Sequence, residues 1–367
     1  MKNTFGSTLS VTVFGESHGA YIGATLDGLA PGIRIDDAYI SECLTRRRPQ
    51  AGISTTRREA DEYTIVSGVL NGYSTGAPLT VLIKNAEQRS EDYRETAHLP
   101  RPSHADYPAY CKYHGFEDTR GGGHFSGRLT AALVAVGAIV RSALAVQGIR
   151  IATHIDRLGG IRDVPLTEAT MERVYETALP VIDGTAADAM RRVIEGARAD
   201  ADSVGGVLET LVTGLPAGLG EPMFDSIESV LSHAMFSIPA VKGVEFGDGF
   251  ALADMRGSEA NDGLCIRNGA VATLSNHMGG IGGGITNGMP VRFRCAIKPT
   301  PSIAREQKSV SLSDMTEQTL TVKGRHDPCI VHRAAAVVDA LTAIALADLL
   351  MQRFGTDVLM PKGETTL

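Results

Sequence analysis

Two series of glycine and proline residues, far apart in the chain, repeat the same internal spacing. Each series precedes an alternating segment, and the two segments end in Ile83-Lys84 and Ile297-Lys298. The series are Gly68, Gly72, Gly76 and Pro78, and Gly280, Gly284, Gly288 and Pro290. Such self-similarity is typical of an internal repeat, in which each copy contributes the same succession of elements. The sequence therefore favours one pseudo-symmetric fold over two unrelated domains.

The repeat extends to other elements of the chain. Residues 24–32 read as a strand and a turn that lead into a helical pattern, and residues 211–218 lead into a similar one. A long apolar helix is then predicted from Arg128 and another from Arg333. Strands that alternate with helices between Gly/Pro turns are typical of α/β (α+β) proteins. The expected bounds are 1–367 for a single domain, and about 5–150 and 204–353 for its pseudo-repeats.

A polar stretch between the repeats, about residues 153–203, is predicted to contain one further helix. This helix would pass through Met190, Val193 and Ile194. Thr185, with Asp188 three residues later, is predicted to form a capping box at its start. We expect this part of the chain to have a structural or oligomerisation role.

The composition limits the class of protein. With 35 Lys+Arg and 42 Asp+Glu, the formal net charge is −7, which gives no overall attraction to nucleic acid or to a membrane. The five cysteines are odd in number and form no C-x-x-C pair, so we expect reduced thiols rather than a disulfide framework. A signal peptide and an uninterrupted apolar run of about 18 residues are both lacking. We expect a cytoplasmic protein with no metal site.

Three glycine-rich stretches carry groups that bind anions or transfer protons. They are residues 15–19 (Gly-Glu-Ser-His-Gly), 120–128 (Arg-Gly-Gly-Gly-His-Phe-Ser-Gly-Arg) and 324–329 (Gly-Arg-His-Asp-Pro-Cys). The last two run into predicted helices, where free backbone N–H groups favour a negative ligand. His18 follows a predicted strand and could donate a proton near neutral pH, although a lone histidine is more often structural. Together the stretches indicate an active site for an anionic ligand.

Two of these stretches also have a structural interpretation. Ser126 could be a helix N-cap, and Asp327 followed by Pro328 is ordinary chemistry for the start of a helix. A cap does not require three glycines before Ser126, or Arg325 and His326 before Asp327. We therefore expect ligand binding in addition to any capping.

A basic segment follows the first predicted helix. It contains the arginines at 46–48, then Pro49, which should end the helix, and the arginines at 57–58. The segment could be a solvated helix end favoured by the dipole. A loop after Pro49 would instead present guanidinium groups that bind carboxylate and phosphate in a bidentate manner. The next segment, 85–120, has no clean period and contains several histidines and tyrosines, which is typical of a lid or binding loop.

In this order and at these separations, the motifs resemble the chorismate synthase family, from Phe5-Gly6 to the helix after Pro328. Residues 101–106 (Arg-Pro-Ser-His-Ala-Asp) are similar to the family's R-P-G-H-A-D, with Ser103 in place of glycine. The resemblance implies a β-α-β sandwich with helices enclosed between sheets. It also implies an anti 1,4-elimination of phosphate from 5-enolpyruvylshikimate 3-phosphate, which yields chorismate and requires reduced FMN.

The resemblance also implies roles for individual residues. His18 would assist the departing phosphate, and His104 and Asp327 would set the protonation of the flavin. Substrate binding is implied for Arg46, Arg47, Arg48, Ser126 and Arg128. FMN binding is implied for His124, Phe125, Ser126, Pro239, Ala240, Gly283, Lys298, Pro299, Thr300, Pro301, Ser302 and Arg325. The chain differs from the usual family residues at His124-Phe125 (Arg-Ser), Pro239 (Asn) and Pro301 (Ser).

One loop position bears on how the flavin is reduced. In the family, this position and the one equivalent to Arg47 are associated with NADPH. This position is often basic but is Ile53 here, and an apolar side chain cannot pair with a 2′-phosphate, although Arg57 or Arg58 could substitute. We therefore expect no intrinsic NADPH:FMN reductase activity, an external flavin reductase or other electron supply, and a homotetramer. Alternatives are an NADPH-dependent flavin reductase and an anion- or RNA-binding module; the net charge and the absence of Trp disfavour the latter.

Overall fold

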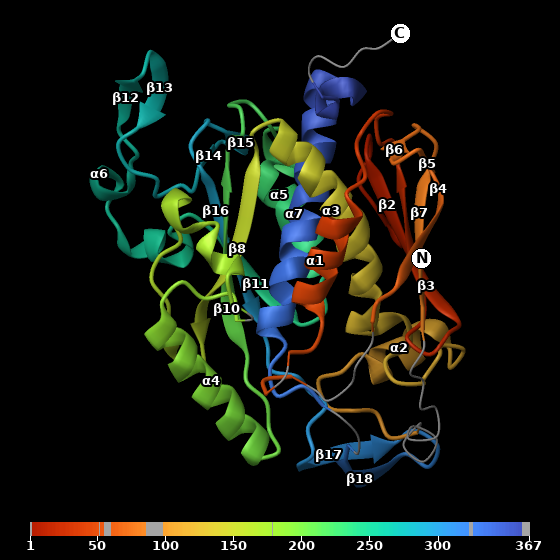
Figure 1. Ribbon diagram of the computed structural model, residues 1–367. Coiled ribbons are helices and arrows are strands. Elements are labelled where there is room, and N and C mark those ends of the chain that lie inside the picture. The colour runs from red at the N-terminus through yellow and green to blue at the C-terminus, as the bar shows by residue number, and fades with distance from the viewer. Residues whose placement is uncertain are drawn as a thin grey trace.

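The computed structural model describes residues 2–50, 52–54, 60–85, 98–177, 179–322 and 326–361. Two five-stranded antiparallel sheets enclose a layer of helices, α1, α3, α5 and α7 (Figure 1). The strand order is β1-β2-β3-β7-β4 in the first sheet and β11-β16-β10-β8-β9 in the second. This arrangement confirms the expected β-α-β sandwich of the α/β class.

The bounds of the elements follow the predicted succession. The first sheet consists of β1 (Thr4–Phe5), β2 (Ser10–Gly15), β3 (Tyr21–Asp27), β4 (Tyr63–Ser67) and β7 (Leu79–Lys84). The second consists of β8 (Arg150–Leu158), β9 (Ile161–Arg162), β10 (Gly206–Thr213), β11 (Val241–Phe246) and β16 (Val291–Ile297). The helices are α1 (Asp37–Arg47), α2 (Asp106–Tyr113), α3 (Thr130–Val146), α4 (Gly184–Ala199), α5 (Ile227–Phe236), α6 (Gly257–Ala260) and α7 (Val331–Phe354).

The two sheets are built from the same succession of elements, which is the expected pseudo-duplication. In each half a helix follows one strand, α1 after β3 and α5 after β10, and a long helix, α3 or α7, ends the half. A small hairpin precedes the later strand β7 or β16, namely β5 (Val69–Leu70) with β6 (Tyr73–Ser74), or β14 (Ile281–Gly282) with β15 (Ile285–Thr286). The glycines of both predicted series have φ angles of 80–87°, so the repeated spacing marks repeated turns. The outer bounds of the repeats stay a prediction.

Helices α3 and α7 form the centre of the core. Both are long and apolar enough to cross a membrane by length and composition, but in the structure they are largely or wholly buried. A helix enclosed between two sheets has no solvent-facing side, and it is therefore apolar around its whole circumference. The protein core accounts for the hydrophobicity of both helices.

The stretch between the repeats covers the outer face of the second sheet. Residues 163–182 bring a second, smaller apolar cluster against β8 and β10, formed by Leu166, Met171, Val174 and Ile182 on Ala152 and Leu211. Helix α4 passes through Met190 and Ile194, as predicted. The predicted capping box is wrong: Asp183 is the N-cap, and its carboxylate accepts from the backbone N–H groups of Thr185 and Ala186. The Asp two residues before Thr185 therefore caps the first turn of the helix.

Two hairpins project from the sandwich. The hairpin of β12 (Leu264–Arg267) and β13 (Ala270–Thr273) extends away from the second sheet (Figure 1). The hairpin of β17 (Glu306–Ser311) and β18 (Thr316–Thr321) lies at the same end of the molecule as α2. Helix α2 itself lies within the segment for which the sequence predicted no regular structure.

Candidate active site

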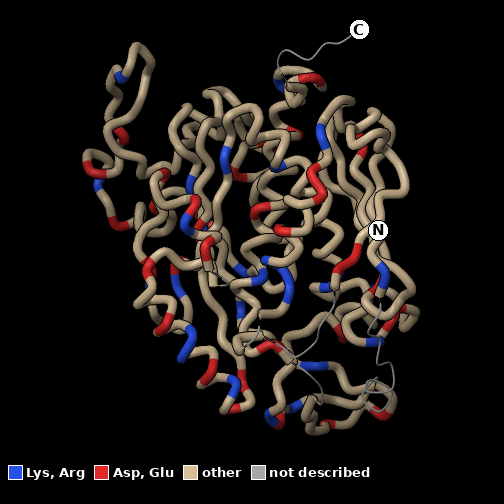
Figure 2. The backbone as a smooth tube through the Cα atoms, viewed as in Figure 1, with Lys and Arg blue, Asp and Glu red and all other residues tan. Residues whose placement is uncertain are grey.

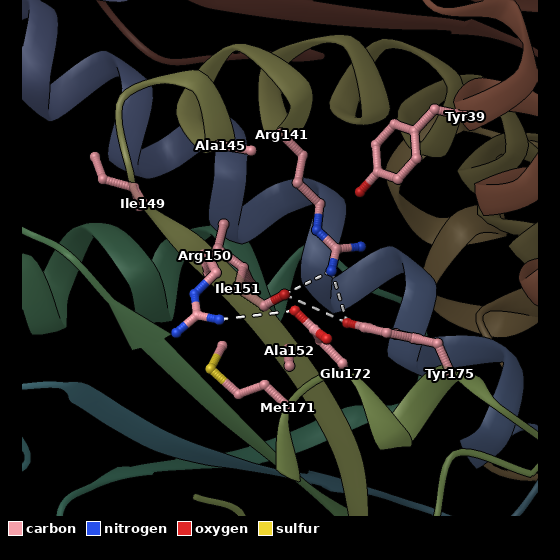
Figure 3. Close-up of a pocket in the computed structure, with 10 residues that line it drawn as sticks. All are labelled: Tyr39, Arg141, Ala145, Ile149, Arg150, Ile151, Ala152, Met171, Glu172 and Tyr175. Carbon is pink, nitrogen blue, oxygen red and sulfur yellow. Dashed lines mark hydrogen bonds and ion pairs between the residues drawn. The ribbon is translucent and has the colours of Figure 1, made fainter. Parts of the chain in front are cut away.

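A small cavity of about 140 Å³ lies between α3 and β8, but its polar groups already have protein partners (Figure 3). Arg141 donates to the carbonyl of Ile151 (2.5 Å) and to the hydroxyl of Tyr175 (2.8 Å), and it lies 3.1 Å from the carboxylate of Asp339. No described residue of the three glycine-rich stretches lines this cavity. We therefore assign it a structural role.

A much larger cavity, of about 960 Å³, opens between the sheets at the ends of α1, α3 and α7. Figure 2 shows basic residues where α1 ends, in the same part of the molecule. The cavity brings together groups from all three glycine-rich stretches and from the long loop. The predicted residues that line it are His18, Arg47, His104, His124, Phe125, Ser126, Arg128, Pro239, Ala240, Lys298, Thr300, Pro301, Ser302 and Asp327.

Some predicted site residues do not line this cavity. Arg46 turns away from it, pairs with Glu42 and lies with its guanidinium 3.8 Å from the ring centre of Tyr175. Gly283 lies in the β14–β15 hairpin, which precedes β16, whereas Lys298 follows β16. Arg48, Ile53 and Pro299 are also absent from its lining, and Ile53 is only 1% exposed. Arg57, Arg58 and Arg325 lie outside the described residues.

His18 lies in a turn after β2, as predicted, and the glycine loop packs on its ring. Its Nδ1 lies 3.0 Å from the hydroxyl of Ser17, and the backbone of Ser17 donates to the carbonyl of Gly123 (3.0 Å). A Cβ at Gly121 would be 2.4 Å from Cε1 of His18, and Gly121 has a φ of +67°. Only glycine fits both constraints, which explains part of the triple-glycine run.

Arg47 and Arg128 are buried and share the carboxylate of Asp61. Arg47 donates from Nη1 to Asp61 (3.0 Å), from Nε to Thr130 (3.0 Å) and from Nη2 to the carbonyl of Gly127 (3.0 Å). Arg128 also pairs with Asp61. Both guanidinium groups line the cavity beside this shared carboxylate. The sequence analysis missed Asp61, which no motif or spacing distinguishes from its acidic neighbours.

The loop that carries His104 is held by the second half of the chain. The backbone N–H of Leu312 donates to the carbonyl of His98 (3.0 Å). The hydroxyl of Ser309 donates to the carbonyl of Pro100 (2.7 Å). Lys298 donates from Nζ to the carbonyl of Ser103 (2.6 Å). The β17–β18 hairpin and the segment after β16 therefore fix the loop at the cavity.

Asp327 is not a helix N-cap, contrary to the structural interpretation of its sequence. Helix α7 begins at Val331, with Ile330 at the cap position. The carboxylate of Asp327 accepts from Nη1 of Arg333 (2.5 Å), and Nε of Arg333 donates to the carbonyl of Arg47 (2.9 Å). Arg333, which the sequence analysis did not assign to the site, thus links Asp327 to the buried arginines. Its position on the first turn of the predicted helix was the available signal.

Ser126 has the predicted capping role. Its hydroxyl accepts from the backbone N–H of Arg128 (3.2 Å), at the start of the turn that leads into α3. His124 contacts the carbonyl of Gly15 through Nδ1 (2.8 Å), and the ring of Phe125 packs edge-on against Tyr113. These two residues tie the glycine loop to β2 and to α2.

The cavity has one apolar wall and one polar end. The apolar wall is formed by Val11, Val13, Leu133, Ile238, Val337 and Leu341. At the polar end, burial and the neighbouring charge of Lys242 lower the pKa of Lys298. The hydroxyl of Thr300 is buried there and has no hydrogen-bond partner among the described residues. A hydroxyl of this kind in the same cavity as two ammonium groups suits an anionic ligand group.

Comparison with known proteins relates this arrangement to one family. The family model described as chorismate synthase matches residues 9–351. The chorismate synthase of Aeropyrum pernix is 45% identical over 98% of this chain and 95% of its own length. That of Thermococcus gammatolerans is 48% identical over 95% of this chain and 97% of its own length. A solved structure titled "Crystal Structure of Chorismate Synthase" superposes with a TM-score of 0.74 at 29% identity and covers 95% of this chain and 94% of that one. The chain belongs to the chorismate synthase family, lyases of the shikimate pathway.

Proposed function

We propose that the protein converts 5-enolpyruvylshikimate 3-phosphate to chorismate by anti 1,4-elimination of phosphate and of a hydrogen from C6, with reduced FMN as cofactor. The observation that carries the proposal is the convergence of His18, His104 and two buried arginines on one cavity. Its volume of about 960 Å³ lies at the upper end of small-molecule sites, which leaves room for a substrate beside a cofactor.

The residues present fit FMN. The apolar wall, which includes Leu133, Ile238 and Val337, suits the flat faces of an isoalloxazine ring. The polar end, with Lys298, Ser302 and the Thr300 hydroxyl that has no partner in the described part of the chain, suits a phosphate. When bound, reduced FMN would supply the transient electron donation that the elimination needs. Pro239 and Pro301 also line this region and would contribute shape rather than amide donors.

The arginine pair would bind the substrate anions. Arg47 and Arg128 are held rigidly by Asp61 and by backbone carbonyls, so little side-chain freedom is lost when a ligand binds. Ser126, which also lines the cavity, caps the turn before α3 and so helps to hold Arg128 in place. Arg48, whose Nε lies 3.8 Å from Asp61, would add positive charge beside that carboxylate without lining the cavity, whereas Arg46 would not take part.

Proton transfer is assigned to the two histidines. His18 would donate to the departing phosphate, with the hydroxyl of Ser17 at Nδ1 (3.0 Å) orienting the ring. His104 would exchange a proton at the flavin, and Asp327, fixed by Arg333, would act beside it. Both histidines line the cavity, so a ligand can reach both.

The direct test is anaerobic incubation with photoreduced FMN and 5-enolpyruvylshikimate 3-phosphate. We expect chorismate absorbance and released phosphate in equal amounts, and none with oxidised FMN. Phosphate release without chorismate would indicate hydrolysis instead. Tight flavin binding with no product of either kind would contradict the proposal.

We also propose that the enzyme lacks an NADPH:FMN reductase activity of its own and depends on an external flavin reductase. Ile53 is buried, and the N–H groups of Arg47 largely serve Asp61, Thr130 and backbone carbonyls, which supports this proposal. Aerobic formation of chorismate with only NADPH and FMN added would overturn it.

We further propose a cytoplasmic homotetramer. The support is the projecting β12–β13 hairpin, on which Leu264, Ile266 and Val271 are 66–75% exposed. An isolated two-stranded hairpin is marginally stable in water, so an apolar one is expected to be covered in the assembly. Light scattering at micromolar concentration should give the mass of four chains, and a monomer would contradict the assignment.

A further inference from the structure

His104 is in close contact with a second acid of its own loop, Asp106. Its Nδ1 lies 2.6 Å from Oδ1 of Asp106 at the start of α2. Arg101 holds the same carboxylate through three bonds, from its backbone N–H (2.9 Å) and Nε (2.8 Å) to Oδ2 and from Nη2 (2.7 Å) to Oδ1. A carboxylate gripped in this way has one available orientation, and it presents Oδ1 to the imidazole.

The hydrogen count on Arg101 decides where the proton of His104 lies. Nη2 of Arg101 also lies 3.1 Å from Nδ1 of His104. A hydrogen bond from Nη2 to Nδ1 would require Nδ1 to carry no hydrogen. However, Nη2 carries two hydrogens, and these go to Asp106 (2.7 Å) and to the carbonyl of Gly121 (2.7 Å). The remaining contact of Nδ1 is a carboxylate, which only accepts. Nδ1 must therefore carry the proton.

The other ring nitrogen is the one free to react. His104 lines the large cavity, and no hydrogen bond of its Nε2 is found within the part of the chain that the structure describes. In a neutral imidazole with a hydrogen on Nδ1, Nε2 is an acceptor that can also receive and return a proton.

We propose that Asp106, held by Arg101, is a positioning residue that keeps a hydrogen on Nδ1 of His104 and so makes Nε2 the atom that exchanges a proton in the cavity. The inference rests on the proposed function, since it specifies how His104 would serve the reaction. Burial raises the pKa of Asp106, but the hydrogen bonds from Arg101 and His104 lower it by more than burial raises it. The net pKa is therefore lowered, and the carboxyl stays ionised at neutral pH.

The same contacts connect this pair to both ends of the site. Arg101 reaches the glycine loop at Gly121 and lies 3.4 Å from the hydroxyl of Ser302 at the polar end. A guanidinium that spans these points fixes the position of the loop as well as the direction of the ring. Arg101 would therefore hold the pair against both the substrate side and the cofactor side of the cavity.

The test compares Asp106→Asn with a matched variant, Asp202→Asn. Asp202 also accepts from an arginine, Arg305 (2.9 Å), and from a backbone N–H, that of Ser203 (2.8 Å), but it does not line the cavity. An asparagine at 106 can donate to Nδ1 and so favour the wrong tautomer. We expect Asp106→Asn to lower kcat by roughly 10²–10⁴-fold with little change in KM or flavin affinity, and Asp202→Asn to retain near wild-type kcat.

A double variant separates positioning from a general structural role. If Asp106 acts through His104, the His104→Ala/Asp106→Asn enzyme should be about as slow as His104→Ala alone. Losses that multiply would overturn the proposal, as would wild-type kcat in Asp106→Asn. Nitrogen NMR should show the His104 hydrogen on Nδ1 in wild type and redistributed in Asp106→Asn. This readout is independent of turnover, so a wild-type protein that made no chorismate would refute the proposed function while the tautomer assignment could still be tested.

Discussion

Gly137 of α3 lies directly against Ala340 of α7, so that a Cβ at position 137 would be 2.4 Å from the Cβ of Ala340. It would also lie 2.8 Å and 3.0 Å from the Cα and carbonyl oxygen of the same residue. We expect Gly137→Ala to lower the free energy of unfolding by about 1–3 kcal/mol, because both helices are enclosed and cannot separate freely. Urea unfolding would measure the loss. Gly196→Ala in α4, where a Cβ meets nothing within 4 Å, should instead stabilise by up to about 1 kcal/mol.

Removal of either cavity histidine should slow the reaction without unfolding the protein. We expect His18→Ala and His104→Ala each to lower turnover by about two orders of magnitude, since loss of one general acid or base costs roughly 10²–10⁴-fold. Anaerobic assays of chorismate formation would measure it. The control is His114→Asn, at a left-handed helix end that asparagine tolerates (φ 59°). Near wild-type rates in both alanine variants would remove these roles.

The buried arginines should control the substrate constant. Replacing Arg47 or Arg128 by Lys removes the planar fork, and we expect KM to rise roughly ten- to hundredfold. Their side chains are only 4% exposed, so circular dichroism must show an intact fold. Arg46→Ala serves as the matched control and should leave KM unchanged, because Arg46 pairs with Glu42 outside the cavity. Equal effects at all three positions would argue against the assignment.

Asp327 should matter for turnover more than for stability. We expect Asp327→Asn to lower turnover by about 10²-fold, because Arg333 loses its anionic partner and the site loses a charge. The free energy of unfolding should change by less than about 1 kcal/mol, as for other partly exposed pairs. Asp202→Asn, which removes an exposed pair with Arg305, is the comparison. Full activity in Asp327→Asn would leave the residue only a structural role.

His154 should make stability depend on pH. Burial alone lowers its pKa, but the hydrogen bonds to Asp163 (2.9 Å) and Glu209 (3.1 Å) outweigh burial and raise its pKa above 6.5. A histidine whose pKa is higher in the folded than in the unfolded protein stabilises the fold when it is protonated. Its contribution is complete at pH values below the unfolded pKa, and it is lost as the pH rises through the pKa of the folded state. Stability should therefore fall as pH increases above about 6.5. In His154→Gln, urea unfolding from pH 6 to 9 should show a weaker dependence, and an unchanged slope would contradict this account.

Much of the fold could be predicted from spacing. Turn glycines repeat because each copy needs positive φ at the same points, so Gly68 and Gly280 indicate the duplication directly. The enclosed layer of helices came from the family resemblance. Periodicity is a weak guide to α7, since a helix buried on all sides has no polar face to give it a period.

Site residues could be predicted where a motif lies beside a turn. They were harder to predict where the position of a side chain depends on which of several distant groups it contacts. His18 and Ser126 lie where their motifs predicted. Arg46 and Arg47 are adjacent in sequence but point to different sides of α1, and only the ring of Tyr175 and the carboxylate of Asp61 decide which enters the cavity. Such long-range pairings leave no local signal. The predicted cap at Thr185 was wrong for a similar reason, since several nearby polar residues could begin this helix.

The packing of α3 on α7 has a consequence for biosynthesis of the chain. Helix α3 is complete when residue 146 has been made, but its partner begins only at residue 331. At about 5–20 residues per second, the ribosome needs roughly 10–40 s to supply that partner. During this interval the nascent chain carries an almost wholly apolar helix with one side uncovered. A holdase chaperone that shields α3 would therefore protect the nascent chain most before α7 emerges. Truncation ahead of α7 should yield aggregates rather than a folded half.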